Sequence, residues 1–481
     1  MNRPFFLQWL SFRGGGLRDR VVRSTIWLAI GNGSAKIVNL FKIAILGRLL
    51  APDDFGLMAI AILTLKWLEY FTETGFNKAL VQQKGNIESY LDTAWLVQLA
   101  RGVLLAILLF AMAPVAAYFF AVPHAVQVVR ACSILLIVRS LTNPAMVCLR
   151  RELDFKRIFW WTLTNAIVGL VVAVCAALLY RNVWALVASV IAAAIASLVL
   201  SYVIKPYIPR PQFHWQHAKT LMKFGKWIFF LNVVSFVGLY ADSAIVGKLL
   251  GMTHLGFYQM ARQFGMTPSH QIALLISGVM FPAFARLQHT EQRRIAFTQT
   301  LTMVSIVALP MGCFLTAFAE PLVHLILGPR WQAIAPALAW LAWAGIGIAF
   351  IDVSSALFQA CGKPALSVYT MIFQQVLTLT LLRPLILAHG VTGAAAAVAI
   401  ANAVTFVLTL ILAHRIIRFS PIELVLTARQ TLVACVPFAA VTLLPLQTMR
   451  WDYGLALLSV SVSIVVLLPH LKSLLALWRA R

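Results

Sequence analysis

Polar and charged side chains stand inside long apolar stretches of this 481-residue chain. A charged side chain at the centre of a lipid bilayer costs at least about 2.5 to 3.5 kcal/mol, so one that persists there usually faces a protein interior or a water-filled cavity. One face of a helix expected over residues 24–50 carries four polar residues, at spacings of 4, 3 and 3: Asn32, Lys36, Asn39 and Lys42. Two ammonium groups and two amides on one face are suited to binding an anion.

Three further expected helices, over 55–76, 224–250 and 255–281, also carry polar faces. Their polar residues are, in chain order, Lys66, Glu69, Glu73, Asn232, Asp242, Gln259, Arg262, Gln263 and His270. Other apolar stretches hold Arg101, Arg130, Arg139, Asp352 and Arg383. Because the cations outnumber the acids, we expect a cationic cavity lined by the amides and His270.

The best candidates for contacting an anion are Lys36, Lys42 and Arg262, since none has an acidic residue nearby in the sequence. Two further cations, Lys66 and Arg139, join this predicted substrate-binding set. Lys66 has an alternative role, because it can pair with Glu69 or Glu73 on its own helix. For Arg101, Arg130 and Arg383 we favour positions near helix ends, where the charged head reaches the membrane surface.

Ion coupling would need a carboxylate inside the membrane, and the candidates are Asp242, Glu69, Glu73 and Asp352. Asp242 is the best of them, with an ion pair to Lys42 as the alternative. His270 alone is read as a hydrogen-bonded core histidine rather than a proton relay. The adjacent Asp53 and Asp54 are interpreted as a helix cap and linker rather than metal ligands. No catalytic residue, metal site or cofactor is predicted, and the chain lacks the phosphate loop of ATP-hydrolysing proteins.

The helices that position these residues follow from composition. Apolar residues make up 61% of the chain and charged residues 11%, whereas soluble proteins carry about 25% charged residues. Apolar blocks of about 20 residues can cross the bilayer as helices. We therefore predict an all-α polytopic membrane protein with about 14 spans, at 24–50, 55–76, 93–120, 126–148, 158–180, 182–204, 224–250, 255–281, 295–319, 333–360, 364–388, 391–413, 428–448 and 453–471.

The loops between these spans predict the orientation of the chain. With a cytoplasmic N-terminus, 26 Lys and Arg fall on the cytoplasmic side and five on the other. This asymmetry is typical of membrane proteins and places both termini in the cytoplasm. It also explains the net charge of +24 without a nucleic acid partner. The six cysteines form no C-x-x-C pair and indicate neither disulfides nor zinc.

The chain repeats itself at an offset of 200 residues. Trp27 matches Trp227, Asn32 matches Asn232, and the Gly-Arg-Leu-Leu segment at 47–50 matches Gly-Lys-Leu-Leu at 247–250. Parallel repeats of this kind are a recurring design of secondary transporters, although a duplication that serves packing alone is the alternative. We expect a cytoplasmic segment at 1–23, an N-lobe at 24–205, a cytoplasmic linker at 206–223, a C-lobe at 224–418 and two extra helices within 419–481.

Several local segments support a family resemblance. They are GRLLAPDDFG at 47–56, GKLLGMTHLGFYQMA at 247–261, FPAFARLQ at 281–288, EPLVHLILGPRW at 320–331 and the Gly-Lys-Pro turn at 362–364. Their order and spacing resemble the Wzx and WzxC-like polysaccharide flippases of the MOP superfamily. The resemblance implies two six-helix lobes arranged as a V that open alternately to each side of the membrane.

The resemblance also implies a function. The expected activity is the transfer of undecaprenyl pyrophosphate-linked oligosaccharide from the cytoplasmic to the periplasmic leaflet of a bacterial inner membrane, for exopolysaccharide or lipopolysaccharide biosynthesis. The expected partners are the lipid-linked substrate, membrane lipid, H⁺ or Na⁺, and polysaccharide polymerase and export proteins. The alternatives are a lipid II flippase, a multidrug exporter of the same superfamily, and a membrane oligosaccharide polymerase or ligase. A cation excess disfavours the exporter of organic cations, and short outer loops disfavour the enzyme.

Overall fold

The computed structural model describes residues 17–72, 88–152, 154–209, 225–287, 289–419 and 435–436. The regular elements in these ranges are helices, eight of which are long and apolar enough to cross a membrane. Twelve of the predicted spans fall on helices of the described ranges. The last two, 428–448 and 453–471, lie outside the described residues. The prediction of an all-α polytopic membrane protein is thus confirmed.

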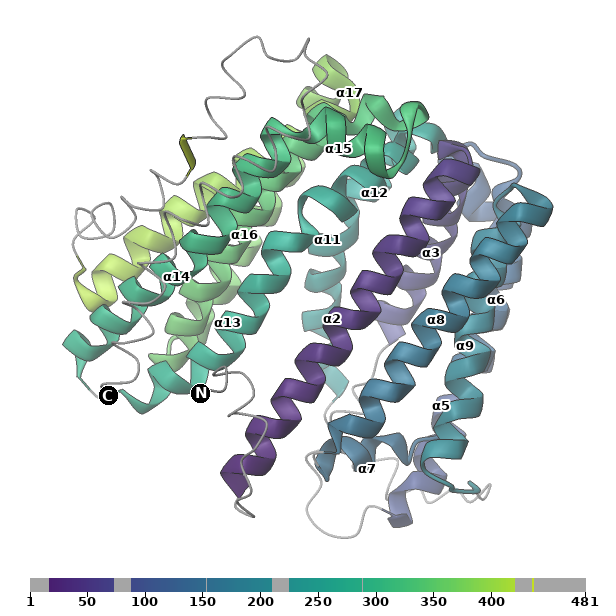
Figure 1. Cartoon of the computed structure of the whole chain (residues 1–481), viewed down its shortest axis with the longest axis horizontal. Helices are drawn as coiled ribbons and strands as arrows, with labels where there is room; N and C mark the ends of the chain where they lie inside the picture. Colours follow the sequence, from purple (N-terminus) through teal and green to yellow (C-terminus); the bar gives the residue numbers. More distant parts are fainter. Residues whose placement is uncertain are drawn as a thin grey trace, which may run out of the picture. The chain divides into compact units, whose positions relative to one another are not determined.

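The chain forms two compact units, Met1–Phe236 and Val237–Arg481, and their boundary lies inside helix α11. The first unit is built around the helices α2 (Leu17–Leu49), α3 (Pro52–Thr72), α5 (Glu88–Phe120), α6 (Ala125–Ser140), α7 (Met146–Arg151), α8 (Phe155–Tyr180) and α9 (Trp184–Ile204). Helix α8 packs between α2 and α9, and α6 packs on α5, α3 and α9 (Figure 1). These contacts bring the polar faces of α3, α5 and α6 together.

The predicted single span at 126–148 is wrong, because α6 ends at Ser140 and the short helix α7 begins at Met146. Asn143 causes the break. Its Oδ1 accepts a hydrogen bond from the backbone N–H of Ala145 at 2.9 Å, and its Nδ2 donates to the carbonyl oxygen of Lys205 at 2.7 Å. An Asn that bonds its own backbone two residues on favours a turn, and the following Pro144 disfavours a continuous helix.

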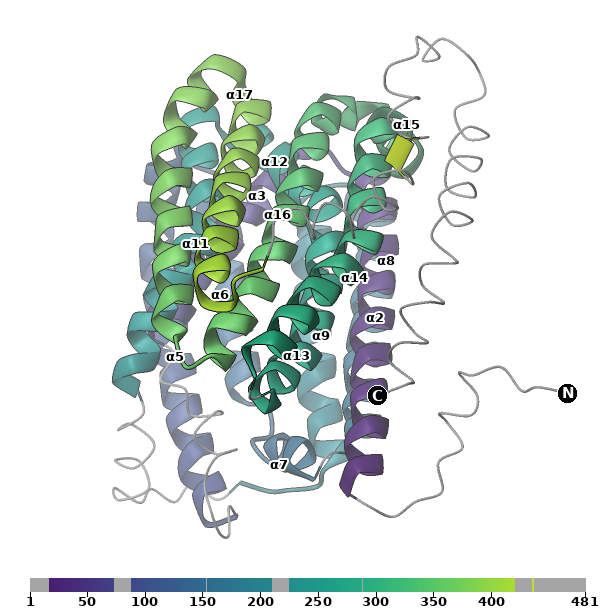
Figure 2. The same ribbon diagram turned by 90° about the vertical axis from the view of Figure 1, so that its left-hand side faces the viewer.

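The second unit has helix α16 at its centre. Its elements are α11 (Gly225–Leu250, shared with the first unit), α12 (Met252–Gly265), α13 (Thr267–Arg286), α14 (Thr290–Ala317), α15 (Ala319–Ile326), the 3₁₀ helix η1 (Pro329–Ile334), α16 (Ala335–Ala360) and α17 (Pro364–Ile417). Helices α12, α13, α14 and α17 all pack on α16 (Figure 2). The predicted span at 255–281 is divided into α12 and α13 at Met266.

Helix α17 changes direction at Gly390, whose φ of 58° and ψ of −132° are not helical. This residue separates the predicted spans 364–388 and 391–413. A positive φ is easily adopted by glycine, which has no Cβ. Gly393 adds a close contact, because a Cβ there would lie only 1.8 Å from the carbonyl oxygen of Leu385. Both glycines are needed for the two halves of α17 to fold back on each other.

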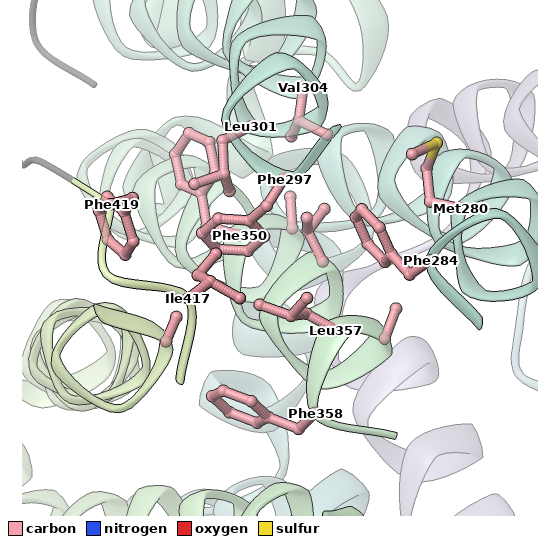
Figure 3. Close-up of a cluster of buried hydrophobic side chains, with 14 of the residues drawn as sticks. Met280, Phe284, Phe297, Leu301, Val304, Phe350, Leu357, Phe358, Ile417 and Phe419 are labelled. Carbon is pink, nitrogen blue, oxygen red and sulfur yellow. The ribbon is translucent and has the colours of Figure 1, made fainter. Parts of the chain in front are cut away.

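The core of the second unit is aromatic and aliphatic (Figure 3). Phe284, Phe297 and Leu357 are almost completely buried between α13, α14 and α16. Phe350 stacks on Phe406 of α17, with ring centroids 4.7 Å apart. This packing fixes the rotation of α16, which carries the ionisable residue Asp352.

Candidate functional site

Glu69 of α3 is the centre of a charge cluster in the first unit. Its carboxylate accepts hydrogen bonds from Lys66 Nζ at 2.6 Å and from Arg139 Nη1 of α6 at 3.0 Å. Their side chains keep part of their surface exposed, 28% for Lys66, 22% for Glu69 and 43% for Arg139. The local pairing of Lys66 with Glu69, foreseen as an alternative, is therefore present. Arg139 joins the same carboxylate, and Glu73 lies outside the described residues.

Arg101 of α5 extends this charge cluster. Its Nη2 donates to the carbonyl oxygen of Glu69 at 3.0 Å and to Oγ1 of Thr72 at 3.1 Å. The sequence favoured a position near a helix end for this arginine, and the structure places it against the end of α3. A cation there also interacts favourably with the carbonyl groups of the helix end. Two cations thus bind the Glu69 carboxylate, and a third binds the backbone carbonyl oxygen of the same residue.

Close packing of α5 on α6 positions Arg139. Gly102 lies against Ser140, and a Cβ at residue 102 would be 2.2 Å from the Cβ of Ser140. Gln98 reinforces the contact by donating from Nε2 to the carbonyl oxygens of Arg139 and Ser140, each at 3.3 Å. Neither Gln98 nor Gly102 was predicted as part of the site. Their role depends on a contact between helices that sequence spacing does not report.

The predicted polar face of α2 is arranged differently. Lys36 and Lys42 are half-buried, and neither forms an ion pair with a described carboxylate of the first unit. Asn39 donates from Nδ2 to the carbonyl oxygen of Ala35 at 3.0 Å, and Asn32 is exposed. Lys36 and Lys42 therefore remain candidates for binding an anion.

Asp242 of α11 is the centre of a second, more buried cluster, with only 7% of its side chain exposed. Arg262 of α12 donates from Nη1 to both carboxylate oxygens, at 3.0 and 2.9 Å. Tyr258, which is fully buried, donates its hydroxyl to Oδ2 at 2.7 Å. The backbone N–H of Ser243 donates to Oδ1 at 2.6 Å. The Asp242 carboxylate is thus surrounded by donors.

This geometry corrects the prediction that Arg262 lacks an acidic partner. Arg262 pairs with Asp242 inside the second unit, and its Nη1 also donates to the carbonyl oxygen of Leu239 at 2.9 Å. Lys42 had been named as the alternative partner of Asp242, and the partner that the structure places beside Asp242 is Arg262. Tyr258 was missed by the sequence reasoning. Its spacing of four residues from Arg262 places both on one face of α12 and could have revealed it.

His270 and Asp352 form a third pair. His270 Nε2 on α13 lies 3.5 Å from Asp352 Oδ2 on α16. Both had been considered separately, and nothing in their sequence positions linked them. The remaining predicted lining residues are Gln259 and Gln263, half-buried on α12, and Asn232, buried on α11.

The other predictions have these outcomes. Asp54 caps α3, since its Oδ2 accepts a hydrogen bond from the backbone N–H of Ala51 at 3.0 Å. Arg130 lies over the ring of Phe110, 4.6 Å from its centroid, and Arg383 is exposed. Among the described residues, no group of three or more His, Cys, Asp or Glu side chains could hold a metal ion.

The described fold is similar to the folds of two solved membrane transporters. A structure titled lipid II flippase MurJ, inward closed conformation, aligns with a TM-score of 0.75, covers 94% of this chain and 100% of that chain, and is 16% identical. An inward-facing multidrug resistance MATE family transporter of the MOP superfamily aligns with a TM-score of 0.64, covering 80% of this chain and 94% of that chain at 17% identity. At these identities the likeness concerns the fold alone.

The family assignment comes from the sequence. The profile of the polysaccharide biosynthesis protein family matches residues 45–336, more than half of the chain. The chain belongs to this family, which agrees with the resemblance found in its local segments.

Similar proteins have been described in several organisms. The succinoglycan biosynthesis transport protein ExoT of Rhizobium meliloti (strain 1021) is 28% identical over 324 residues, 67% of this chain and 65% of ExoT. The lipopolysaccharide biosynthesis protein WzxC of Escherichia coli (strain K12) is 21% identical over 337 residues, 69% of this chain and 68% of WzxC. The teichuronic acid biosynthesis protein TuaB of Bacillus subtilis (strain 168) is 23% identical over 356 residues, 73% of this chain and 74% of TuaB.

Proposed function

We propose that this protein moves a lipid-linked oligosaccharide, carried on undecaprenyl pyrophosphate, from the cytoplasmic to the periplasmic leaflet of a bacterial inner membrane. Its product would supply exopolysaccharide or lipopolysaccharide assembly. Family membership supports the link to polysaccharide biosynthesis. The names of ExoT and WzxC, a transport protein and a lipopolysaccharide biosynthesis protein, point in the same direction.

The observation that carries this proposal is the positive charge in the described part of the first unit. In the charge cluster, Lys66 and Arg139 share the carboxylate of Glu69, and Arg101 donates to the backbone carbonyl oxygen of the same residue. Lys36 and Lys42 add two ammonium groups that have no described carboxylate partner in that unit. Charges inside a membrane protein are usually balanced unless a ligand or water compensates them.

A pyrophosphate-linked lipid would supply the missing negative charge. Its phosphates must pass through a region of low dielectric constant, where an unpaired charge is heavily penalised. Arginine can bind such oxygens with two parallel hydrogen bonds, and lysine acts as a compact point charge. The lipid tail can stay in the bilayer while the sugars cross through polar surroundings. We expect the two units to alternate between openings to either side, with H⁺ or Na⁺ as the coupling ion.

Export of polymer in a deletion strain tests the proposal. Loss of the gene should abolish surface polysaccharide and leave lipid-linked repeat units in the cytoplasmic leaflet. Complementation with Lys36→Gln or Lys42→Gln should restore the protein level but less than about a tenth of export, because a hydrogen bond to a charged group is worth about 1.5 to 3 kcal/mol and a neutral one about 1. Lys36→Arg and Lys42→Arg should retain part of the export.

Lys363→Gln is the matched control, since Lys363 is an exposed lysine between α16 and α17. It should export polymer like the parent. Normal polymer in the deletion strain would overturn the proposed function. Normal export by both Lys→Gln variants would instead remove Lys36 and Lys42 from the site and leave the transport assignment in place.

Reporter fusions test the proposed orientation, in which both termini are cytoplasmic. Fusions after residues 120, 181 and 330 should report a periplasmic position, and those after 86, 154 and 290 a cytoplasmic one. A cytoplasmic report after residue 120 would contradict this orientation.

A further inference from the structure

His270 and Asp352 face each other between α13 and α16 of the second unit. Asp352 lies inside the candidate membrane span Pro329–Ala360. It follows the start of α16, Ala335, by 17 residues and precedes its end, Ala360, by eight, or about 26 Å and about 12 Å of helix. The side chains of His270 and Asp352 are 30% and 29% exposed, and their nearest nitrogen and oxygen atoms are 3.5 Å apart. A carboxylate and an imidazole at this depth are costly unless they serve a function.

Oδ2 of Asp352 has no hydrogen-bond partner among the described residues, and neither has Oγ of Ser269, the residue that precedes His270 in the chain. Ser269 is completely buried. Buried polar atoms in proteins are nearly always satisfied, so orphaned ones call for a ligand, water or ion that completes them. A single proton placed between His270 and Asp352 would satisfy the carboxylate oxygen without any bulky ligand.

The junction between α12 and α13, which precedes His270, packs closely on α16. Helix α12 ends at Gly265 and α13 begins at Thr267. A Cβ at Gly265 would lie 2.7 Å from the carbonyl oxygen of Leu338, and a Cβ at Gly345 would lie 2.7 Å from that of Met266. The junction at Met266, where the backbone dihedral angles stay helical, is therefore in close contact with α16 at two glycines.

The charged groups on the neighbouring elements are engaged elsewhere. On α12, Arg262 and Tyr258 bind Asp242. On α14, Arg294 pairs with Glu291 at 2.6 Å. Arg293, also on α14, donates to the carbonyl oxygen of Leu287 at 2.8 Å and so stays at the end of α13. Among the described residues, His270 and Asp352 therefore form an ion pair only with each other.

The titratable groups of the remaining elements are also accounted for. Elements α15 and η1 carry Glu320, His324 and Arg330, which all precede the start of α16, whereas Asp352 lies in the second half of that helix. Helix α17 carries Tyr369, Arg383, His389, His414 and Arg415, all exposed. Arg286 of α13 is exposed as well.

We propose that His270 and Asp352 bind and release one proton as a unit, and that this proton is the coupling ion of the transport function proposed above. With neutral imidazole and ionised carboxylate the pair carries one negative charge. Uptake of a proton from water makes the pair neutral overall, which lowers the cost of enclosing it in the membrane. Release to water on the other side restores the charge. Imidazole is suited to this role because its charge changes near neutral pH.

Infrared difference spectroscopy of the full-length protein tests proton binding directly. The protein is reconstituted in vesicles of phosphatidylethanolamine and phosphatidylglycerol, and spectra at pH 5 and pH 8 are subtracted. The parent should show a protonated-carboxyl band that is missing in Asp352→Asn. In His270→Gln the band should appear at a different pH, because the carboxyl group has lost its imidazole neighbour. His289→Gln, which removes an exposed histidine at the start of α14, should leave the spectrum unchanged.

Polymer export by the same variants gives a second readout. Asp352→Asn and His270→Gln should reduce export at least tenfold, and Asp352→Glu should restore part of it. Difference spectra that are identical in the parent, Asp352→Asn and His270→Gln would overturn the proton-binding proposal, even if the protein exports polymer. A titrating Asp352 in a protein that exports no polysaccharide would support the proton site and refute only the proposed cargo.

Discussion

The surroundings of a carboxylate inside the membrane differ between the two units. In the first unit Glu69 is shared by Lys66 and Arg139, and all three side chains keep between 22% and 43% of their surface exposed. In the second unit Asp242 is 7% exposed and is enclosed by Arg262 and Tyr258 of the next helix. Among the described residues, the first arrangement places two cations on one carboxylate, whereas the second pairs one cation with one carboxylate.

The difference arises within related segments. Residues 47–50 and 247–250 match in sequence, and in both copies the glycine is buried and the following cation is exposed. Yet the first copy has Lys42 at the position where the second has Asp242. The charge at this position is therefore positive in the first copy and negative in the second. The helix with Lys42 can attract an anion, whereas the helix with Asp242 is bound to its neighbour. Under the proposed function, the first unit would supply cations for the substrate, whereas the Asp242–Arg262 pair of the second unit joins α11 to α12.

The largest expected effect is that of Arg262→Gln. Removing one partner of a buried ion pair leaves an uncompensated charge and typically costs about 3 to 5 kcal/mol. We expect a clear fall in the melting temperature of the purified protein and in its level in the membrane. The double variant Arg262→Gln/Asp242→Asn should recover much of this loss. If the single variant were as stable as the parent but failed to export polymer, Arg262 would belong to the substrate site instead.

Glu69→Gln should have a smaller effect of the same kind. Its partners Lys66 and Arg139 are partly exposed and can be hydrated, and ion pairs in such positions are worth about 0 to 1 kcal/mol. Stability should fall by no more than about 1 kcal/mol, and export should be retained because the excess of cations grows. The thermal unfolding of Glu69→Gln and Arg262→Gln, measured side by side, checks the contrast between the units. Equal destabilisation by the two variants would contradict this contrast between the units.

Tyr258→Phe should have the smallest effect of the three. It removes one hydrogen bond to Asp242 but keeps the ion pair with Arg262 and the buried ring. Hydrogen bonds between membrane helices contribute about 0.6 kcal/mol on average and at most about 1.7. A lowered melting temperature with unchanged export is expected. A loss as large as that of Arg262→Gln would mean that the hydroxyl, rather than the ion pair, holds α11 to α12.

The positions of the helices could be read from the sequence because they depend on local properties. Apolar stretches of about 20 residues and glycine- or proline-containing turns indicate where a chain crosses the membrane and where it reverses. The turn at Gly362 and the reversal at Gly390, both with positive φ, lie between predicted spans. The end of α6 before Asn143 and the junction of α12 and α13 at Met266 were missed, although a proline follows each of them, Pro144 and Pro268.

The pairing of charges was decided by tertiary structure. Sequence spacing places Arg262 on a polar face but does not report that Asp242, 20 residues earlier, lies on the facing side of another helix. It likewise does not link His270 to Asp352, since they come from helices far apart in the chain. Which side chains meet depends on the rotation and depth of each helix, and these follow from close contacts such as Gly102 with Ser140 and Gly345 with Met266. The residue types therefore determined that charge lies inside the membrane, and packing between helices determined which charges are neutralised.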